Sequence, residues 1–256
     1  MLSNPAETVQ QSGVATSLPE QLPENTPFYG FLQRPSLVDF PGKIAAVYFT
    51  SGCNFSCGYC HNARLLGARK SGITREAFTS SINKFMRTDW INGVTLSGGE
   101  PTLSQDLPQF IRWIRSRGLS VKLDTNGSNP RMLEAIIDDI DYIAMDVKCG
   151  LERYPEFVRF TDTAAIRESI NLIKSRAADY EFRTTVIETV HTVDEMQAIG
   201  EAVRDARRYI LQPFIPHDDL PDPAYRRMTR TSPDVMDTLA AAIAPYVREV
   251  GKKGRQ

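Results

Sequence analysis

The sequence lacks a long apolar run, and it lacks an excess of charge of either sign. No run approaches the roughly 18 apolar residues that a bilayer-spanning helix needs, and the N-terminus has neither the basic nor the apolar region of a signal peptide. With 30 basic and 31 acidic residues, no global charge draws the chain to nucleic acid or to an anionic membrane. We therefore expect a cytoplasmic protein with no nucleic-acid or membrane partner.

Cysteine is also scarce, and its placement matters more than its number. Four cysteines in 256 residues do not make a disulfide framework and fit a reducing compartment, where thiolates stay free for metal. Three of them, Cys53, Cys57 and Cys60, lie within eight positions at C-x3-C-x2-C spacing. Three thiolates so spaced can converge on an iron-sulfur cube, whose four irons normally take four protein sulfurs. The spacing predicts a 4Fe-4S cluster with one open iron, which a substrate or cofactor could chelate.

Two plainer interpretations compete with the three-ligand cluster. A structural zinc site could use the three cysteines and His61, but zinc modules usually bring their ligands as two separated pairs, and the adjacent Cys60 and His61 would struggle to close one tetrahedron. Cys149 could instead supply a fourth cluster ligand and make an electron-transfer centre. A lone cysteine far away in sequence is more often a small buried hydrophobe.

The chain divides into a polar N-terminal segment and one long region of alternating elements. Residues 1–27 are rich in Pro, Ser, Gln, Glu and Thr without an apolar period, which predicts a flexible extension, with a docking arm as the alternative. Residues 28–250 are expected to form one domain, and residues 149–160 and 213–233 are expected loops. Expected strands lie at 44–50, 93–96, 119–123, 142–145, 181–187 and 209–212, and expected helices at 74–86, 104–117, 130–138, 163–176, 192–207 and 233–250.

Six strand-then-helix units in succession predict an α/β fold with a parallel sheet and right-handed crossovers. Six units are fewer than the eight of a closed barrel, so the pattern favours an open, partial (β/α)6 barrel. An open doubly wound sheet is the main alternative.

Nearly every unusual polar cluster follows the C-terminal end of an expected strand. In a parallel sheet these ends share one rim, so the clusters should converge there. Gly98 and Gly99 would let backbone approach a ligand closely, although a tight turn explains them equally well. The clusters are the cysteine loop, Gly98-Gly99-Glu100, Asp124-Thr125-Asn126, Asp146-Val147-Lys148 and Gln212, with Arg183 inside the fifth strand.

Charge at this rim needs a partner. Asp124 and Asp146 on neighbouring strand ends are costly unless a cation, such as a bound monovalent ion, or a positive ligand lies between them. Asp124 and Asn126 could alternatively cap the next helix, and Arg183 could make an ordinary ion pair. His61 is expected to order the cysteine loop, and His191 and His217 carry no assignment.

The cysteine loop, with Tyr59 just before Cys60, resembles that of the radical S-adenosylmethionine superfamily. The resemblance implies that the open iron binds S-adenosylmethionine and that an electron from the cluster cleaves it to a 5'-deoxyadenosyl radical. It further implies the (β/α)6 architecture, contact of Tyr59 with the adenine and of Gly98-Gly99-Glu100 with the methionine, and a pocket lined by the Asp124 and Asp146 clusters. Arg183 could then hold the methionine carboxylate or a ribose hydroxyl.

Flanking segments are similar to the longer form of the anaerobic ribonucleoside-triphosphate reductase activating proteins. The similarity covers about residues 28–248 and includes LVDFPGK, TLSGGEPTL, LDTNG, YIAMDVK and YILQPF; Ser51 and Gly58 stand where that family often has proline. It implies a protein substrate, the large glycyl-radical subunit, and reduced flavodoxin or ferredoxin as electron donor. Activases of other glycyl-radical enzymes, small-molecule radical enzymes and a non-enzymatic electron-transfer protein are the alternatives.

Overall fold

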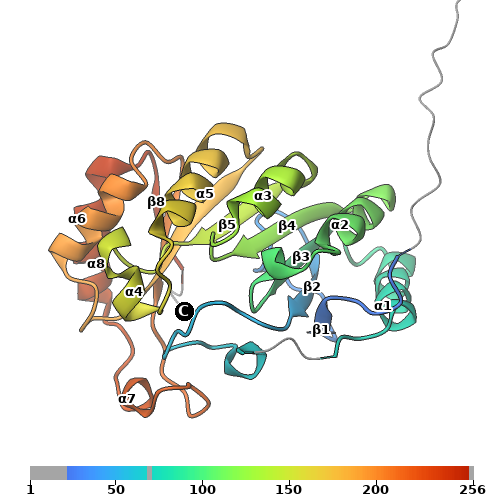
Figure 1. The fold of residues 1–256 in the computed structure, drawn as a ribbon, viewed down its shortest axis with the longest axis horizontal. Coiled ribbons are helices and arrows are strands. Elements are labelled where there is room, and N and C mark those ends of the chain that lie inside the picture. Colours follow the sequence, from blue (N-terminus) through green and yellow to red (C-terminus); the bar gives the residue numbers. More distant parts are fainter. Residues whose placement is uncertain (1–21, 68–70, 254–256) are drawn as a thin grey trace, which may run out of the picture.

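A computed structural model describes residues 22–67 and 71–253. Eight strands form one sheet in unbroken chain order, with β1 antiparallel to β2 and every later neighbouring pair parallel (Figure 1). The strands are β1 Phe28–Phe31, β2 Ala45–Thr50, β3 Gly93–Gly98, β4 Ser120–Thr125, β5 Tyr142–Asp146, β6 Tyr180–Val186, β7 Tyr209–Pro213 and β8 Val250–Lys252.

Helices connect the parallel strands and form an outer layer on the sheet (Figure 1). Side-chain caps fix several of their starts: Thr74, Asn129, Asp162, Thr192 and Ser232 each accept a hydrogen bond from a backbone N–H in the first turn. The helices are α1 Arg75–Arg87, α2 Leu107–Ser116, α3 Pro130–Ile136, α4 Tyr154–Phe157, α5 Thr163–Arg176, α6 Val193–Ala202, α7 Pro223–Arg226 and α8 Pro233–Ile243.

The strand order confirms the partial barrel. A doubly wound sheet reverses its strand order at a switch point, whereas here every crossover steps to the next strand in the same direction. Among the described residues β1 and β8 do not pair, so the sheet stays open. All six expected parallel strands are present, and β1 and β8 extend the sheet at its two edges.

Some predicted boundaries are wrong for local reasons. The terminal helix ends at Ile243 instead of Val250, because Pro245 cannot donate the next helical hydrogen bond, and the chain then enters β8. The helix α6 ends at Ala202, shortly before Asp205 with its left-handed φ of 65°. Both expected loops contain a short helix, α4 and α7 respectively.

Part of the polar N-terminal segment packs on the domain. Leu22 is buried, Thr26 donates from Oγ1 to the carbonyl of Ile73 at 2.7 Å, and Arg75 N donates to the carbonyl of Glu24 at 2.9 Å. The remainder of the predicted extension, residues 1–21, lies outside the described residues.

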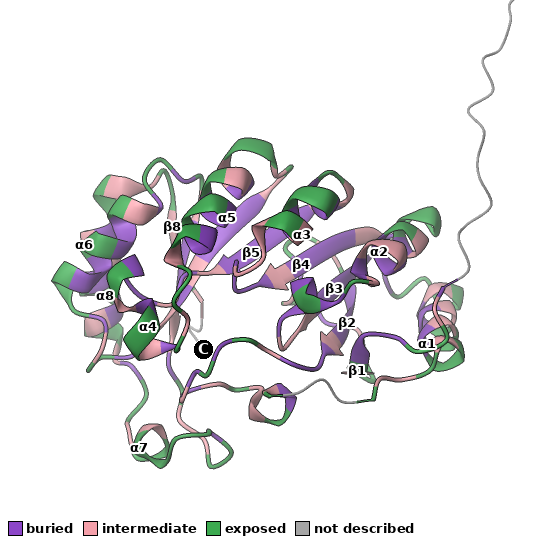
Figure 2. Cartoon of the chain, in the orientation of Figure 1, coloured by how far each residue is buried: buried purple, intermediate pink, exposed green. Residues whose placement is uncertain are grey.

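Side chains alternate between the two faces of the sheet. On β4, which Figure 2 shows as largely buried, Val121 and Leu123 belong to the same apolar core as Leu107, Phe110, Ile111 and Ile114 of α2. Lys122 and Asp124 alternate with them and face the opposite side, where Asp124 lines a cavity. Phe40, Ala45, Tyr142 and Ala144 form a separate apolar cluster at the amino ends of the strands. No helix in the described ranges has the length and apolar character to cross a bilayer.

Candidate active site

One cavity of about 520 Å³ lies at the carboxyl ends of the strands. It confirms the expected convergence, because segments from six strand ends reach it. Ile215 lines it and is 46% exposed, so the cavity opens to solvent. Of the predicted site residues, all but Glu100 line it: Cys53, Cys57, Tyr59, Cys60, His61, Gly98, Gly99, Asp124, Thr125, Asn126, Asp146, Lys148, Arg183 and Gln212.

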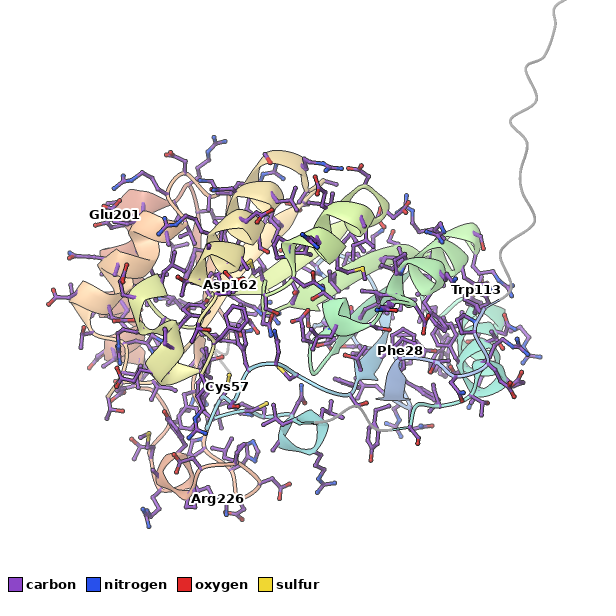
Figure 3. All side chains as sticks on the ribbon, in the orientation of Figure 1. Phe28, Cys57, Trp113, Asp162, Glu201 and Arg226 are labelled. Carbon is purple, nitrogen blue, oxygen red and sulfur yellow. The ribbon has the colours of Figure 1, made fainter. Side chains whose placement is uncertain are left out.

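Neighbouring segments hold the cysteine loop through its backbone. Gly52 N donates to the carbonyl of Leu65 at 2.8 Å, and Ser56 N donates to the carbonyl of Val158 at 3.0 Å. The carbonyl of Gly58 accepts from Asp222 N at 3.0 Å, next to α7. The loop, on which Figure 3 labels Cys57, is thus fixed by the segments around α4 and α7. The packing also accounts for Gly58, because a Cβ there would lie 2.7 Å from the Tyr225 ring.

The two glycines of the second cluster are required by backbone packing. A Cβ on Gly98, whose φ is 114°, would lie 2.4 Å from Thr50 N, and one on Gly99 would lie 2.1 Å from the carbonyl oxygen of Gly52. Gly99 N donates to the carbonyl of Thr50 at 2.9 Å. The two glycines therefore allow the end of β3 to lie against the backbone at the start of the cysteine loop. Close backbone packing accounts for them without a ligand.

Glu100 lies behind the cavity and joins two of the predicted clusters. Its Oε1 accepts from Thr102 Oγ1 at 2.6 Å and from Thr125 Oγ1 at 2.8 Å, and its Oε2 accepts from Asn126 N at 2.6 Å. The side chain is 1% exposed. The carboxylate therefore supports the hydrogen-bond network between the loops after β3 and β4, and its oxygens are directed at protein donors.

Five charged side chains form a row across the concave face of the sheet. Arg183 on β6 donates from Nε to Asp146 Oδ1 at 2.5 Å and contacts Asp124 Oδ1 through Nη1 at 3.4 Å. At the ends of the row, Lys122 pairs with Asp124, and Lys148 Nζ donates to Asp146 Oδ2 at 2.9 Å. The expectation that a positive charge must separate the two aspartates is met by the protein's own arginine. The repulsion between Asp124 and Asp146 therefore does not require a bound monovalent cation between them.

Mutual ion pairing favours the charged forms of the two aspartates and of Lys148. Burial would raise the pKa of Asp124 and of Asp146, but the Arg183 guanidinium, with a lysine on each side, outweighs burial and holds both pKa values below their ordinary range. Burial would lower the pKa of Lys148, yet Asp146 outweighs it and raises that pKa. For Lys122 burial outweighs the attraction of Asp124 and lowers the pKa, so ion pairing offsets burial for the two aspartates and Lys148 but not for Lys122.

Helix capping does not explain the polar residues after β4. Asn129 caps α3, and Asn126 instead donates from Nδ2 to Asn54 Oδ1 at 3.1 Å and to the sulfur of Cys53 at 3.7 Å. Asp124 accepts from Ser97 Oγ at 2.9 Å. Both residues therefore face the cavity, and Asn126 connects directly to the cysteine loop.

Comparison with known proteins identifies the family. The model of the radical S-adenosylmethionine (SAM) superfamily matches residues 47–206, more than half of the chain. The chain belongs to the radical SAM superfamily. A Methanocaldococcus jannaschii protein, provisionally named a glycyl-radical enzyme activating enzyme, is 33% identical over 84% of this chain and 91% of its own length. Pyruvate formate-lyase-activating enzyme of Clostridium pasteurianum is 30% identical over 46% of this chain and 50% of that protein. This radical SAM enzyme therefore belongs with the glycyl-radical enzyme activating enzymes.

Solved structures support the fold of this radical SAM protein. Streptococcus suis SuiB bound to S-adenosylmethionine superposes with a TM-score of 0.62 at 11% identity, over 81% of this chain and 49% of that one. A domain of pyruvate-formate lyase-activating enzyme from Bacteroides vulgatus superposes with a TM-score of 0.52 at 19% identity, over 64% of this chain and 99% of that one. At such identities the likeness concerns the fold alone.

The donor set fits the cluster that the radical SAM family implies. The cysteines are free, and Cys53, Cys57 and Cys60 line one cavity, whereas Cys149 is fully buried and does not line it. Within residues 22–67 and 71–253, no three Cys, His, Asp or Glu side chains are grouped as ligands of a single metal ion. A cube takes each thiolate on a different iron, so its ligands are spread more widely than those of one zinc ion.

Burial disfavours the ionised form of the three thiols. Burial is the largest cause that raises the pKa of each of the three, and it raises the pKa of Cys57 to about 12. At neutral pH these groups stay protonated unless metal binding supplies the compensating positive charge. Cys53, Cys57 and Cys60 are the residues that would hold the cluster, and metal binding would let their thiols ionise.

Three predicted residues have surroundings that the sequence did not specify. The ring of Tyr59 is buried and stacks on Phe157, with centroids 5.3 Å apart, so its side chain is part of an aromatic cluster. His61 is exposed, and its ring contacts that of His217 with centroids 4.7 Å apart. Gln212 lines the cavity from β7 and is half-buried.

Sequence reasoning missed Lys122 and Asn54. Lys122 is 1% exposed and pairs with Asp124, and Asn54 accepts hydrogen bonds from Asn126 and Ser128. A signal for Lys122 exists: it stands two residues before Asp124 in a strand, so both side chains face the same side of the sheet. Asn54 gives no comparable signal, because its partners come from a loop 72 positions later.

Proposed function

We propose that this radical SAM enzyme generates the glycyl radical of anaerobic ribonucleoside-triphosphate reductase, by abstracting hydrogen from a glycine Cα on a loop of the large subunit. The observation that supports it best is the open cavity in which three free thiols meet the polar ends of β3 to β7, with Cys149 outside its lining. The similarity of residues 28–248 to that activating family supplies the choice of target.

Each part of the cavity has a proposed task. Cys53, Cys57 and Cys60 would hold the cluster through their sulfurs, and the row of Asp124, Arg183, Asp146 and Lys148, which lines the same cavity, would orient polar groups of SAM. When bound, the cluster and SAM supply the electron transfer and the deoxyadenosyl radical. Glu100 keeps the loops after β3 and β4 in register behind the site.

The remaining assignments extend the same proposal. Tyr59 offers backbone groups to the adenine, because its ring is already packed. Reduced flavodoxin or ferredoxin is the proposed electron donor, since a low-potential cluster needs a strong reductant. Arg183 can also turn a guanidinium edge toward a carboxylate or a ribose hydroxyl of SAM.

The decisive experiment follows the abstracted atom. The protein, reconstituted anaerobically with iron and sulfide, is incubated with SAM, a reductant and large reductase subunit carrying α-deuterated glycine. We expect deuterium in the 5'-deoxyadenosine and a glycyl radical signal by electron paramagnetic resonance. A Cys57→Ser variant and a reductase whose loop glycine is alanine are the controls. Deoxyadenosine without label transfer would contradict the proposed target.

Another glycyl-radical enzyme is the second candidate target. It is favoured by the Clostridium pasteurianum relative, whose name gives pyruvate formate-lyase as the enzyme that it activates. Replacing the reductase by pyruvate formate-lyase in the same assay separates the two. A small-molecule radical enzyme would instead form deoxyadenosine in response to a metabolite and without either protein.

A further inference from the structure

The backbone of Lys148 lies beyond the regular part of the sheet. The strand β5 ends at Asp146, and the last ladder-like bond in this region runs from Val147 N to the carbonyl of Arg183 at 2.9 Å. Buried backbone groups without a partner are costly, so the next residue needs other partners. Lys148 N donates to the hydroxyl of Tyr154 at 3.0 Å, and the Lys148 carbonyl lies 2.9 Å from Nε2 of His191. Two side chains therefore take the place of a neighbouring strand.

The contacts of His191 define its protonation state. The Lys148 carbonyl can only accept a hydrogen bond, so Nε2 must carry the proton. On the other side of the ring, Ile187 N lies 2.9 Å from Nδ1 and the Ile187 carbonyl lies farther away, at 3.3 Å, so the shorter contact assigns Nδ1 as the unprotonated acceptor. The ring is 1% exposed, and burial lowers its pKa. His191 is thus a neutral imidazole whose tautomer is set by two backbone groups.

His191 also contacts the cysteine loop through one intermediate ring. Phe157 lies edge-on to the His191 ring, with centroids 6.0 Å apart at 84°, and stacks on Tyr59 with centroids 5.3 Å apart. Tyr59 stands between the cluster ligands Cys57 and Cys60. The same imidazole therefore supports both the segment after β5 and the loop that carries the thiols.

We propose that His191, through the hydrogen bond from its Nε2–H to the Lys148 carbonyl, is a positioning residue that orients the Asp146 and Lys148 side chains toward SAM. Lys148 pairs with Asp146 in the cavity, and its backbone, held by Tyr154 and His191 beyond the end of β5, is the base from which its side chain reaches Asp146. This inference rests on the proposed SAM site. It assigns to the β6–α6 connection a role in cofactor binding without direct contact to the cofactor.

The first test needs no cofactor. The chain has three histidines, so nitrogen-15 NMR of the metal-free protein can resolve each imidazole. We expect one ring with an unprotonated Nδ1 and a protonated Nε2 near about pH 7, lost in His191→Gln. An Nδ1–H tautomer or a charged ring at neutral pH would overturn the proposed contact.

The second test measures SAM affinity of the reconstituted protein from the spectral change of its cluster. His191→Phe removes the hydrogen bond and keeps an aromatic ring, whereas His191→Gln retains an N–H at a similar reach. We expect His191→Phe to weaken SAM binding about tenfold, as for one lost hydrogen bond, and His191→Gln to stay within about threefold of the parent. Tyr154→Phe, which removes the partner of Lys148 N, should act in the same direction and replaces His191→Phe if that variant does not fold.

Tyr180→Phe is the matched control. It removes a buried hydroxyl that accepts from Arg207 N at 3.0 Å, near the opposite end of β6, and should lower thermal stability without changing SAM affinity. Equal SAM affinity in His191→Phe and the parent, or equal losses in the Phe and Gln variants, would overturn the positioning role. Failure of the parent to bind SAM would instead refute the cofactor site, and the NMR result would still decide the tautomer.

Discussion

Replacing Arg183 by methionine tests how the cavity tolerates two neighbouring carboxylates. Methionine keeps much of the apolar volume of the side chain and removes the guanidinium that contacts both Asp124 and Asp146. Each aspartate retains one lysine, Lys122 or Lys148, but the charge between the two carboxylates is gone. Their mutual repulsion then acts in a largely buried setting, because the three side chains of this bridge are only 13–24% exposed.

The expected loss can be estimated from burial. Removing one partner of a buried ion pair costs about 3–5 kcal/mol, and the remaining lysines place this case near the lower end, at about 3 kcal/mol. Arg176→Met is the matched control, since Arg176 pairs with Asp138 at 2.6 Å but Asp138 is 76% exposed. An exposed pair of this kind contributes less than about 1 kcal/mol.

The difference in free energy of unfolding between the parent and Arg183→Met should decrease at low pH. Arg183 holds the pKa of Asp146 below its ordinary value of 3.8, so the stabilisation is fully present above that value. It is lost as the pH falls below 3.8 toward the lowered pKa, because the carboxylate then takes up a proton in the folded protein as well. The gap between parent and variant should be constant from about pH 7 to about pH 5 and should narrow below about pH 4.

Urea unfolding of the metal-free proteins, followed by circular dichroism and tryptophan fluorescence, provides the free energies of unfolding. The parent, Arg183→Met and Arg176→Met are compared at each pH. If Arg183→Met loses no more stability than Arg176→Met, the buried bridge does not stabilise the fold. A gap that stays constant down to about pH 3 would show that its origin is packing and not charge.

Three further changes probe other parts of the site. Cys57→Ser should abolish retention of the cluster after anaerobic reconstitution while Cys149→Ser retains it, as measured by iron and sulfide content; loss in both would favour a fourth cysteine ligand. Gly99→Ala should lose about 3 kcal/mol in urea unfolding, since its Cβ would lie 2.1 Å from a carbonyl oxygen of the cysteine loop, whereas Gly30→Ala has open space and should lose less than about 1 kcal/mol. Sodium or potassium should not raise the melting temperature of the parent above that in a tetramethylammonium salt of equal ionic strength, but should do so in Arg183→Met; a specific effect in the parent would indicate a cation beside Arg183.

Periodicity and strand-end chemistry predicted most of this architecture. Six buried apolar runs, each followed by an amphipathic stretch, were sufficient for the parallel order, and the polar groups at their ends located the cavity. The three-residue strand β8 escaped prediction because its residues Val250–Lys252 have no apolar run of their own and are fixed by pairing with β7. The ends of α8 and α6 depend on single residues, Pro245 and the left-handed Asp205, and helical periodicity alone did not locate them.

Some site residues could be predicted from their place at a strand end, whereas contacts between residues far apart in the sequence could not. Residues at strand ends, such as Asp146 and Gln212, could be named because a parallel sheet brings these ends together. The pairing of Arg183 with both aspartates could not be derived, since which side chain spans to which depends on the curvature of the sheet. Asn54 and His191 act through backbone or amide partners 72 and 43 positions away, and such contacts leave no pattern in the sequence.

Arg183 on β6 links strands on the concave face of the open sheet. A sheet that closes into a cylinder keeps its radius through the hydrogen bonds of the final strand pair, and that pair is missing from the part of this chain that the structure describes. Here one side chain reaches back across β5 to β4 and ties three adjacent strands together on their inner side. The length of that side chain therefore bears on how far β4 and β6 can separate on the concave face, although no backbone hydrogen bond joins these two strands.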